Sequence, residues 1–261
     1  MMEGRRCIRI DGDNEIVGEC PIAEEVPLSI SLNGKQYITA MMSPGMKREF
    51  VIGHLVSERV VKDLSEIESL EIEGNTAKAI ITNPIRALTS RKPIIRGCGG
   101  SSSFLDEAKL PKITSDLRVD CGGIMESMKA ISVSEVHQAT GGVHSVGLFG
   151  SWGEICICED IGRHNALDKA LGFGIINKIR LEEVFAVSTG RISSDMALKC
   201  SSAGIPLLAS RGATTSLAIT IAEKTGLTLM GFVRGKRVNI YTNSWRVIGS
   251  ALGSQAVSQP V

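Results

Sequence analysis

The sequence predicts a mixed α/β protein, with an α/β C-terminal half and a smaller α+β N-terminal domain. From Val184 onward, short apolar strands alternate with helices that stop at a glycine, as in a parallel sheet with crossover helices. In the first hundred residues, alternating apolar residues flank Asn33-Gly34 and Gly74-Asn75, a pattern typical of β-hairpins. An apolar content of 43% over 261 residues is enough for a sizeable core.

The N-terminal elements follow from local periodicity. Apolar residues alternate from Leu28 to Leu32, and Tyr37 begins the return strand of the first hairpin. Ser43-Pro44 suits the start of a helix, because an apolar stripe at helical spacing follows it: Phe50, Val51, Leu55 and Val56. The second hairpin is expected on the two sides of Gly74-Asn75, and Asn83-Pro84 ends it.

The domain boundary is placed near residues 111–118, because a helix with an apolar stripe begins just after them. This gives an N-terminal domain of residues 1–114 and an α/β domain of residues 115–261, with a frayed tail after about residue 248. In the second domain we expect strands at 184–187, 205–209 and 227–233, and helices at 195–203 and 216–225.

Composition argues against several classes of partner. A net charge of +1 and a pI of about 7.6 give no one-sign field for nucleic acid or a membrane surface. No stretch approaches the roughly 20 apolar residues of a membrane helix, and no apolar run follows the N-terminal arginines. The seven cysteines are odd in number and scattered, so we expect reduced thiols and a cytoplasmic protein.

Small, hydroxyl-bearing and basic residues follow each of the last three strands. These segments are residues 188–191, 210–215 and 234–237. Because the carboxyl ends of parallel strands meet at one edge, the three segments are expected to share a rim that binds an anion such as phosphate, with Arg191 as one of its cations. Taken alone, each segment is better explained as a solvated turn, and the third as a basic β-turn; the three together favour the anion site.

A polar run at residues 159–169 leads into another helix. Arg163, His164 and Asn165 offer donors near its start. Helix capping and a local Asp-Arg pair would explain them equally well, so both interpretations stay open.

Cys98 stands apart from the other cysteines. Glycines flank it, Arg96 precedes it and three serines follow, which predicts an accessible loop thiol whose pKa a nearby cation lowers. A free cysteine is otherwise a small buried hydrophobe, and this is expected of Cys7, Cys20, Cys121 and Cys200. Cys156 and Cys158 alternate on a strand; a zinc site with His144 or His164 is the alternative, but the usual ligand spacing is missing and we expect no metal.

Several spaced motifs resemble the FdhD family of formate dehydrogenase accessory proteins. They occur in the family's order: Thr140-Gly141-Gly142-Val143-His144, the run at 159–169, Ser188–Ser194, Gly204-Ile205-Pro206, Ala213–Ala218, Leu227–Phe232 and Tyr241-Thr242. The resemblance covers about residues 24 to 248. It implies a fold similar to the α/β sandwich of cytidine deaminases, and a homodimer.

The resemblance also implies a sulfurtransferase. A cysteine desulfurase would load sulfur onto the loop cysteine, and the persulfide would sulfurate the molybdenum cofactor, bis(molybdopterin guanine dinucleotide), before its insertion into formate dehydrogenase. Cys98 matches the persulfide position. The segment assigned to cofactor binding matches Phe232, Val233, Arg234, Gly235, Lys236 and Arg237.

One departure concerns the loop, where many members carry a C-x₂-C pair and this chain has Ser101 at the second position. A single thiolate suffices chemically to accept and release sulfur, so we expect function to persist.

Two other functions compete with the carrier: a chaperone that delivers the cofactor without sulfur chemistry, and a zinc hydrolase that uses Cys156, Cys158 and a histidine.

Overall fold

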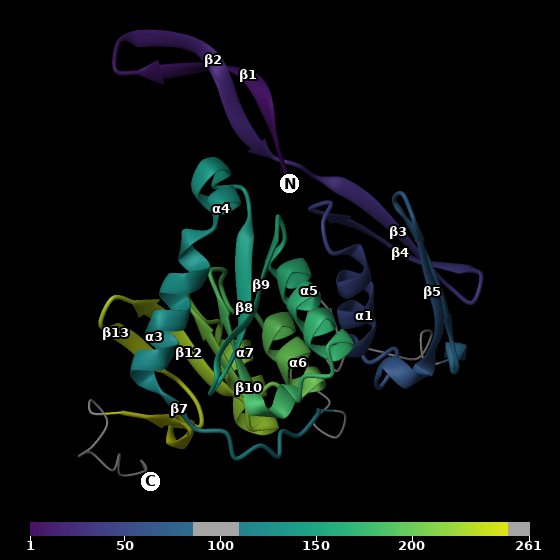
Figure 1. Ribbon diagram of the computed structural model, residues 1–261. Coiled ribbons are helices and arrows are strands. Elements are labelled where there is room, and N and C mark those ends of the chain that lie inside the picture. The colour runs from purple at the N-terminus through teal and green to yellow at the C-terminus, as the bar shows by residue number, and fades with distance from the viewer. Residues whose placement is uncertain (86–109, 250–261) are drawn as a thin grey trace, which may run out of the picture.

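A six-stranded mixed sheet forms the centre of the computed structural model, which describes residues 1–85 and 110–249 (Figure 1). The strand order is β13-β12-β11-β10-β8-β9. The strands are β8 His144–Gly150, β9 Gly153–Asp160, β10 Val184–Ser188, β11 Leu207–Ser210, β12 Thr228–Arg234 and β13 Arg237–Ile240. The predicted parallel arrangement of β10, β11 and β12 is confirmed, and the outer strands run antiparallel to their neighbours.

Helices cover both faces of this sheet (Figure 1). Consecutive residues of a strand point to opposite faces, so Ala186 joins one core cluster and Val187 the other. On the first face pack α5 Arg163–Ile176, α6 Ser194–Ala203 and α7 Ser216–Thr225. On the second face packs α3 Cys121–Ala130, at the position where the sequence predicted a helix. The mixed α/β class is therefore confirmed.

The N-terminal part contains a second sheet, of order β4-β3-β6-β5. Its strands are β3 Val26–Leu32, β4 Lys35–Met42, β5 Ile67–Glu73 and β6 Thr76–Ile81, and both predicted hairpins are confirmed. Asn33, Gly34 and Gly74 occupy their turns with positive φ, as tight hairpin turns require. The predicted helix is α1 Lys47–Ser57, which closes a core of its own against this sheet.

Helices α1 and α5 join the two parts backbone to backbone. A Cβ atom added at Gly53 would lie 1.8 Å from the carbonyl oxygen of Asp168, and one added at Gly172 would lie 1.8 Å from that of Glu49. Any side chain at either glycine would separate the two helices. The close packing therefore depends on glycine at both positions.

A buried ion network lies beside this contact. Asp168 accepts hydrogen bonds from His54, Ser57 and Lys199, at 2.7–3.0 Å. Lys199 also pairs with Glu58 at 3.0 Å. Burial alone would raise the pKa of Asp168, but the Lys199 ammonium and the His54 hydrogen bond outweigh it and lower the pKa to about 2. The network thus ties α1, α5 and α6 together through charge.

The first 23 residues form a hairpin that sequence analysis missed. β1 Met2–Asp11 and β2 Asn14–Ala23 pair only with each other and rise away from the rest of the molecule (Figure 1). Cys7 and Cys20 form a disulfide within it, so the expectation that both are buried thiols is wrong. The β1–β2 register pairs Cys7 with Gly18 and Cys20 with Arg5, so the two cysteines lie in neighbouring rows of one face, which sequence spacing alone does not reveal.

Short elements complete the described chain. The strands β7 Val119–Asp120 and β14 Val247–Ile248 pair in parallel, and α4 Glu135–Thr140 packs near the base of the hairpin. Within residues 1–85 and 110–249, no helix is both long and apolar enough to cross a membrane. The predicted tail beyond Gly249 lies outside the described residues, and the boundary at 111–118 stays a prediction.

Candidate functional site: a basic rim at the carboxyl edge of the sheet

The three segments predicted to share a rim do so. They are residues 188–191, 210–215 and 234–237, which follow β10, β11 and β12, and we call them the rim. Because these strands are adjacent and parallel, their carboxyl ends lie at one edge of the sheet.

Main-chain hydrogen bonds hold the rim segments against one another. The Arg211 N–H donates to the Ser188 carbonyl at 3.0 Å, and a bridge joins Ile192 to Thr214. The Phe232 N–H donates to the Gly212 carbonyl at 3.0 Å. Because these hydrogen bonds join main-chain atoms of different segments, the rim is one ordered structure and not three independent turns.

Glycines bring the rim segments into close backbone contact. A Cβ atom at Gly212 would lie 3.1 Å from Cα and N of Arg191, and one at Gly190 would lie 2.9 Å from Cβ of Arg163. The hydroxyls of Ser188 and Ser210 accept from the N–H groups of these glycines at 3.1 and 2.8 Å. The serines and glycines of the motif therefore shape the backbone.

Four arginines of the rim are exposed: Arg191, Arg211, Arg234 and Arg237. Arg234 Nε donates to the Arg211 carbonyl at 3.0 Å, and its Cζ lies 5.7 Å from the Phe232 ring centroid. Phe232 has φ of 54° at an irregularity in the β12–β13 register, a strained conformation of the kind that clusters at ligand sites. The hydrogen bond of Arg234 and its contact with the Phe232 ring thus fix the conformation of this part of the predicted segment 232–237 next to Arg211.

The polar run at 159–169 divides into two roles. Asp160 pairs with Lys169 at 2.7 Å and accepts from the Ser43 N–H and from Asn165, so this part holds the fold together. Arg163 faces the rim beside Gly190 instead. The polar run thus has a structural role, but through the Asp160–Lys169 pair, since no side-chain hydrogen bond caps α5; a ligand-binding role for Arg163 stays a prediction.

Two buried polar atoms beside the rim have no hydrogen-bond partner within the described chain. They are Arg163 Nε and Thr214 Oγ1. Burial and the Arg163 guanidinium lower the pKa of His144 and of His164, which favours the neutral form of both rings. His164 Nε2 lies 3.2 Å from Ser193 Oγ, at the start of α6. The edge thus combines fixed cations with neutral donors.

A cavity of about 360 Å³ adjoins the rim on the α3 side of the sheet. Met125, Met128 and Val133 contribute apolar walls, and Lys129 stands near Arg211 and Arg234. Sequence analysis predicted only a helix with an apolar stripe in this segment. The place of the two methionines beside the rim follows from the packing of α3 on the sheet, for which the local sequence carries no signal.

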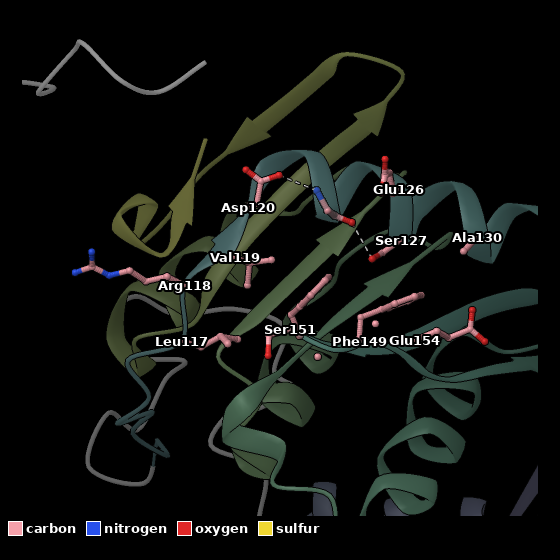
Figure 2. Close-up of a pocket in the computed structure, with 14 residues that line it drawn as sticks. Leu117, Arg118, Val119, Asp120, Glu126, Ser127, Ala130, Phe149, Ser151 and Glu154 are labelled. Atoms are coloured by element: carbon pink, nitrogen blue, oxygen red, sulfur yellow. Dashed lines mark hydrogen bonds between the residues drawn. The ribbon is translucent and has the colours of Figure 1, made fainter. Parts of the chain in front are cut away.

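A larger cavity, of about 510 Å³, lies at the opposite edge of the sheet (Figure 2). Stacked rings of Phe149 and Phe185, 5.8 Å apart, form part of its lining. Its charged lining residues are Arg118, Asp120, Glu126 and Glu154, so acidic groups predominate. It is therefore unsuited to a phosphorylated ligand.

Cys98 is outside the described residues. The expected burial of Cys121, Cys156, Cys158 and Cys200 is confirmed. Within residues 1–85 and 110–249, no three His, Cys, Asp or Glu side chains are grouped so as to hold a metal ion.

The fold and the rim define a mixed α/β protein whose parallel strands end in a cation-rich, glycine-lined edge. The chain belongs to the FdhD/NarQ family, whose model matches residues 23–248. The family suggested by the sequence motifs is therefore confirmed.

Individual relatives agree with this assignment. A protein named sulfur carrier protein FdhD from Bacillus pumilus is 35% identical, over 87% of this chain and 90% of its own length. A protein of the same name from Methanothermobacter thermautotrophicus is 35% identical, over 92% and 96%. A solved protein from Desulfotalea psychrophila, assigned as a formate dehydrogenase accessory protein, has a TM-score of 0.78 at 24% identity and covers 95% of this chain and 99% of its own; this likeness shows the fold.

Proposed function

We propose that this protein is a sulfur carrier for the maturation of formate dehydrogenase. Cys98 would accept sulfur from a cysteine desulfurase as a persulfide and pass it to the molybdenum of bis(molybdopterin guanine dinucleotide). The rim carries the cofactor part of this proposal: four exposed arginines, close-packed glycines and two buried polar atoms without a partner in the described chain lie at one sheet edge. Membership in a family whose relatives are named sulfur carriers supports the chemistry.

The residues at the rim suit the nucleotide part of that substrate. Pyrophosphate is recognised by arginine and by backbone N–H groups that glycine lets it approach, and Arg191, Arg211 and Arg234 offer the arginines. The Arg163 Nε–H and the Thr214 hydroxyl are donors with no partner inside the described chain. The apolar cavity beside Met125 and Met128 offers room next to these charges. Phe232 to Arg237 and Arg191 are thus the proposed cofactor contacts.

The sulfur step needs one thiolate. Cys98 would attack the terminal sulfur of the desulfurase persulfide, the S–S bond would break, and the desulfurase cysteine would leave as a thiolate. Cys98 then carries the terminal sulfur as Cys98–S–SH, with no net oxidation. The reaction requires no second loop cysteine, which agrees with Ser101 in this chain.

Three finer features belong to the same proposal. The sheet covered by helices on both faces supports a core like that of cytidine deaminases. A homodimer and a cytoplasmic location fit the role of a carrier that meets a desulfurase and an apo-enzyme in turn. Residues 1–114 and 115–261 are the two proposed domains, joined through α1 and α5.

The sulfur step is tested by intact-protein mass spectrometry after incubation with a cysteine desulfurase and cysteine. The wild type should gain one sulfur atom that a reductant removes, and Cys98→Ala should gain none. Cys121→Ala, which removes a buried thiol, is the matched control and should gain sulfur normally. A gain unaffected by Cys98→Ala, or none in the wild type, would favour a chaperone that delivers the cofactor without sulfur chemistry.

The cofactor site is tested separately by calorimetry with GDP as the probe. Arg234→Ala should weaken GDP binding by about tenfold to a hundredfold, because a charge-assisted hydrogen bond contributes about 1.5–3 kcal/mol. Arg180→Ala is the matched control, since Arg180 is an exposed arginine that pairs with Glu182 and Glu183 next to the start of β10, at the opposite edge. Equal GDP affinity in the two variants would remove the rim from the proposal.

A further inference from the structure

The Cys7–Cys20 disulfide lies on the β1–β2 hairpin, which projects from the body of the molecule (Figure 1). The family model begins at residue 23, so the hairpin lies outside the part of the chain that the family shares. Within the described residues, the hairpin meets the body at its base, where Ala23 lies beside Gly142. Neither cysteine belongs to the core of either sheet, so the disulfide is an addition to the shared fold.

The backbone of the hairpin keeps the two cysteines close together. The β1–β2 register runs unbroken from the Met2–Ala23 pair at the base to the Asp11–Asn14 pair at the turn, and Gly12 has the positive φ of a tight turn. The two cysteines occupy neighbouring rows of this ladder. The ladder therefore holds their sulfur atoms within reach of each other whether or not they are bonded.

Solvent reaches both cysteines. Neither is buried, whereas the other cysteines of residues 1–85 and 110–249 are buried free thiols. Cys7 is paired in register with Gly18, where an added Cβ atom would meet nothing within 4 Å, so no side chain directly opposite covers its sulfur. Exposed disulfides are the ones that exchange readily, because an attacking thiolate must approach the S–S bond from outside.

Two arginines flank the pair on its face of the hairpin. Arg5 lies directly opposite Cys20, and Arg9 follows Cys7 by two residues on the same strand. Glu3 pairs with Arg5 at 2.8 Å, but Arg9 has no ion pair within the described chain. A cation beside a cysteine stabilises the thiolate, which is the form that attacks a sulfur atom. Cys7 is thus the better placed nucleophile of the two.

Release of sulfur from a persulfide as sulfide requires a two-electron donor. The terminal sulfur of a persulfide is formally uncharged, whereas sulfide carries two more electrons. A pair of thiols supplies these electrons when it forms a disulfide. Many members of the family carry a second cysteine in the loop, and this chain has Ser101 there. The chain therefore has no C-x₂-C pair in the loop, but it has an accessible pair of cysteines on the hairpin.

We propose that Cys7 and Cys20 form a second thiol site, which reduces persulfides and releases their terminal sulfur as hydrogen sulfide. The Cys7 thiolate attacks the terminal sulfur of R–S–SH, the S–S bond breaks, and R–S⁻ leaves and takes up a proton. Cys20 then attacks the Cys7 sulfur of Cys7–S–SH, HS⁻ leaves, and the disulfide forms. In sum, R–S–SH and two thiols give R–SH, H₂S and the disulfide, so the persulfide gains the two electrons that the cysteines lose.

The pair is restored by a second exchange. A cellular dithiol reductant returns the disulfide to two thiols and is itself oxidised. In the cytoplasm, where the proposed function places the protein, disulfides are mostly of this transient kind. The choice of the Cys98 persulfide as the natural substrate rests on the proposed function, whereas the reaction of the hairpin pair with persulfides does not.

The experiment uses the full-length chain with Cys98→Ala, so that its failure cannot be confused with a failure of the Cys98 step. The protein is reduced, desalted and mixed with glutathione persulfide, and the released sulfide and the intact mass are measured. About one sulfide per chain should be released while Cys7 and Cys20 lose two hydrogen atoms. Adding Cys20→Ser should stop the reaction at a one-sulfur mass gain and lower sulfide release at least about tenfold. Adding Cys7→Ser instead should abolish both.

Two matched controls separate this reaction from that of any exposed thiol. Adding Cys121→Ala, which removes a buried thiol, should leave sulfide release unchanged. Adding Arg9→Gln should slow it about twofold, because the loss of thiolate outweighs the gain in nucleophilicity. Arg180→Gln, which removes an exposed arginine outside the hairpin, should leave the rate unchanged.

A purely structural disulfide is the competing role, since a ribbon of two strands is marginally stable in water and a cross-link would stabilise it. Such a disulfide would stay oxidised in the folded chain, and its loss would leave sulfide release unchanged. A folded chain whose disulfide resists dithiothreitol, sulfide release that persists without Cys7 and Cys20, or equal rates in Arg9→Gln and Arg180→Gln would each overturn the proposal.

Discussion

The contact between α1 and α5 gives the sharpest test of how the two parts of the molecule are held together. The perturbation is Gly53→Ala, a single methyl group in the middle of α1. The added carbon would lie 1.8 Å from the Asp168 carbonyl oxygen, about 1.6 Å short of the 3.4 Å at which ordinary contact begins. The obstructing atom belongs to the backbone of another helix, so no side chain can rotate away and the helices must separate.

The magnitude follows from two opposing terms. Overpacking of a well-packed interior costs about 1–3 kcal/mol and occasionally more, and a backbone obstacle places this site at the upper end or beyond. Replacing glycine by alanine inside a helix returns about 1 kcal/mol. We therefore expect the free energy of unfolding to fall by at least about 2 kcal/mol, and Gly172→Ala to behave alike.

Urea denaturation followed by circular dichroism measures this loss. The matched control is Gly123→Ala in α3, where an added Cβ atom meets nothing within 4 Å; it should be neutral or stabilising by up to about 1 kcal/mol. The m-value should be the same in all three variants. If Gly53→Ala lost no more stability than Gly123→Ala, the backbone-to-backbone contact would not exist in solution.

Three further outcomes follow from buried groups. Asp168→Asn should lower the free energy of unfolding by about 3 kcal/mol at pH 7, because it leaves the Lys199 charge underpaired. The folded pKa of Asp168, about 2, lies below the ordinary 3.8, so the stability that its ionisation contributes is present above pH 3.8 and is lost as the pH falls toward 2. Urea titrations should therefore show a smaller stability difference between wild type and variant at pH 3 than at pH 7. Thr214→Val should raise stability by about 1 kcal/mol while weakening GDP binding, because it removes a buried hydroxyl that has no partner in the described chain; a stability loss with unchanged binding would contradict this. Burial raises the pKa of Cys200, so iodoacetamide should label it only after unfolding, as peptide mass spectrometry would show.

The rim could be predicted from sequence because each of its segments is marked by a local pattern of residues. Strands β10, β11 and β12 are short apolar runs, each followed by small or basic residues. Because adjacent parallel strands end at the same edge of a sheet, these residues can be placed together without a structure. Lys129 and Met128 beside the rim could not be found this way. They reach it because α3 crosses the opposite face of the sheet, a relation between segments a hundred residues apart in the chain.

The N-terminal hairpin escaped detection for a different reason. Strand periodicity is visible when one face is buried and the other is wet. In β1 and β2 both faces mix apolar and charged residues, as Arg6 beside Ile8 and Arg9 beside Cys7 illustrate, so no alternation marks either strand.

Helix α5 connects the buried network to the rim. His164 and Asp168 are one turn apart on α5, and both contact α6: His164 reaches Ser193 at its start, and Asp168 pairs with Lys199 further along. The first rim segment leads directly into α6, so these two contacts fix where Arg191 lies. Displacing α5 through Gly53→Ala should therefore weaken GDP binding as well as stability, whereas Gly123→Ala should leave GDP binding unchanged. Unchanged binding in Gly53→Ala would mean that the rim is positioned by its own backbone hydrogen bonds alone.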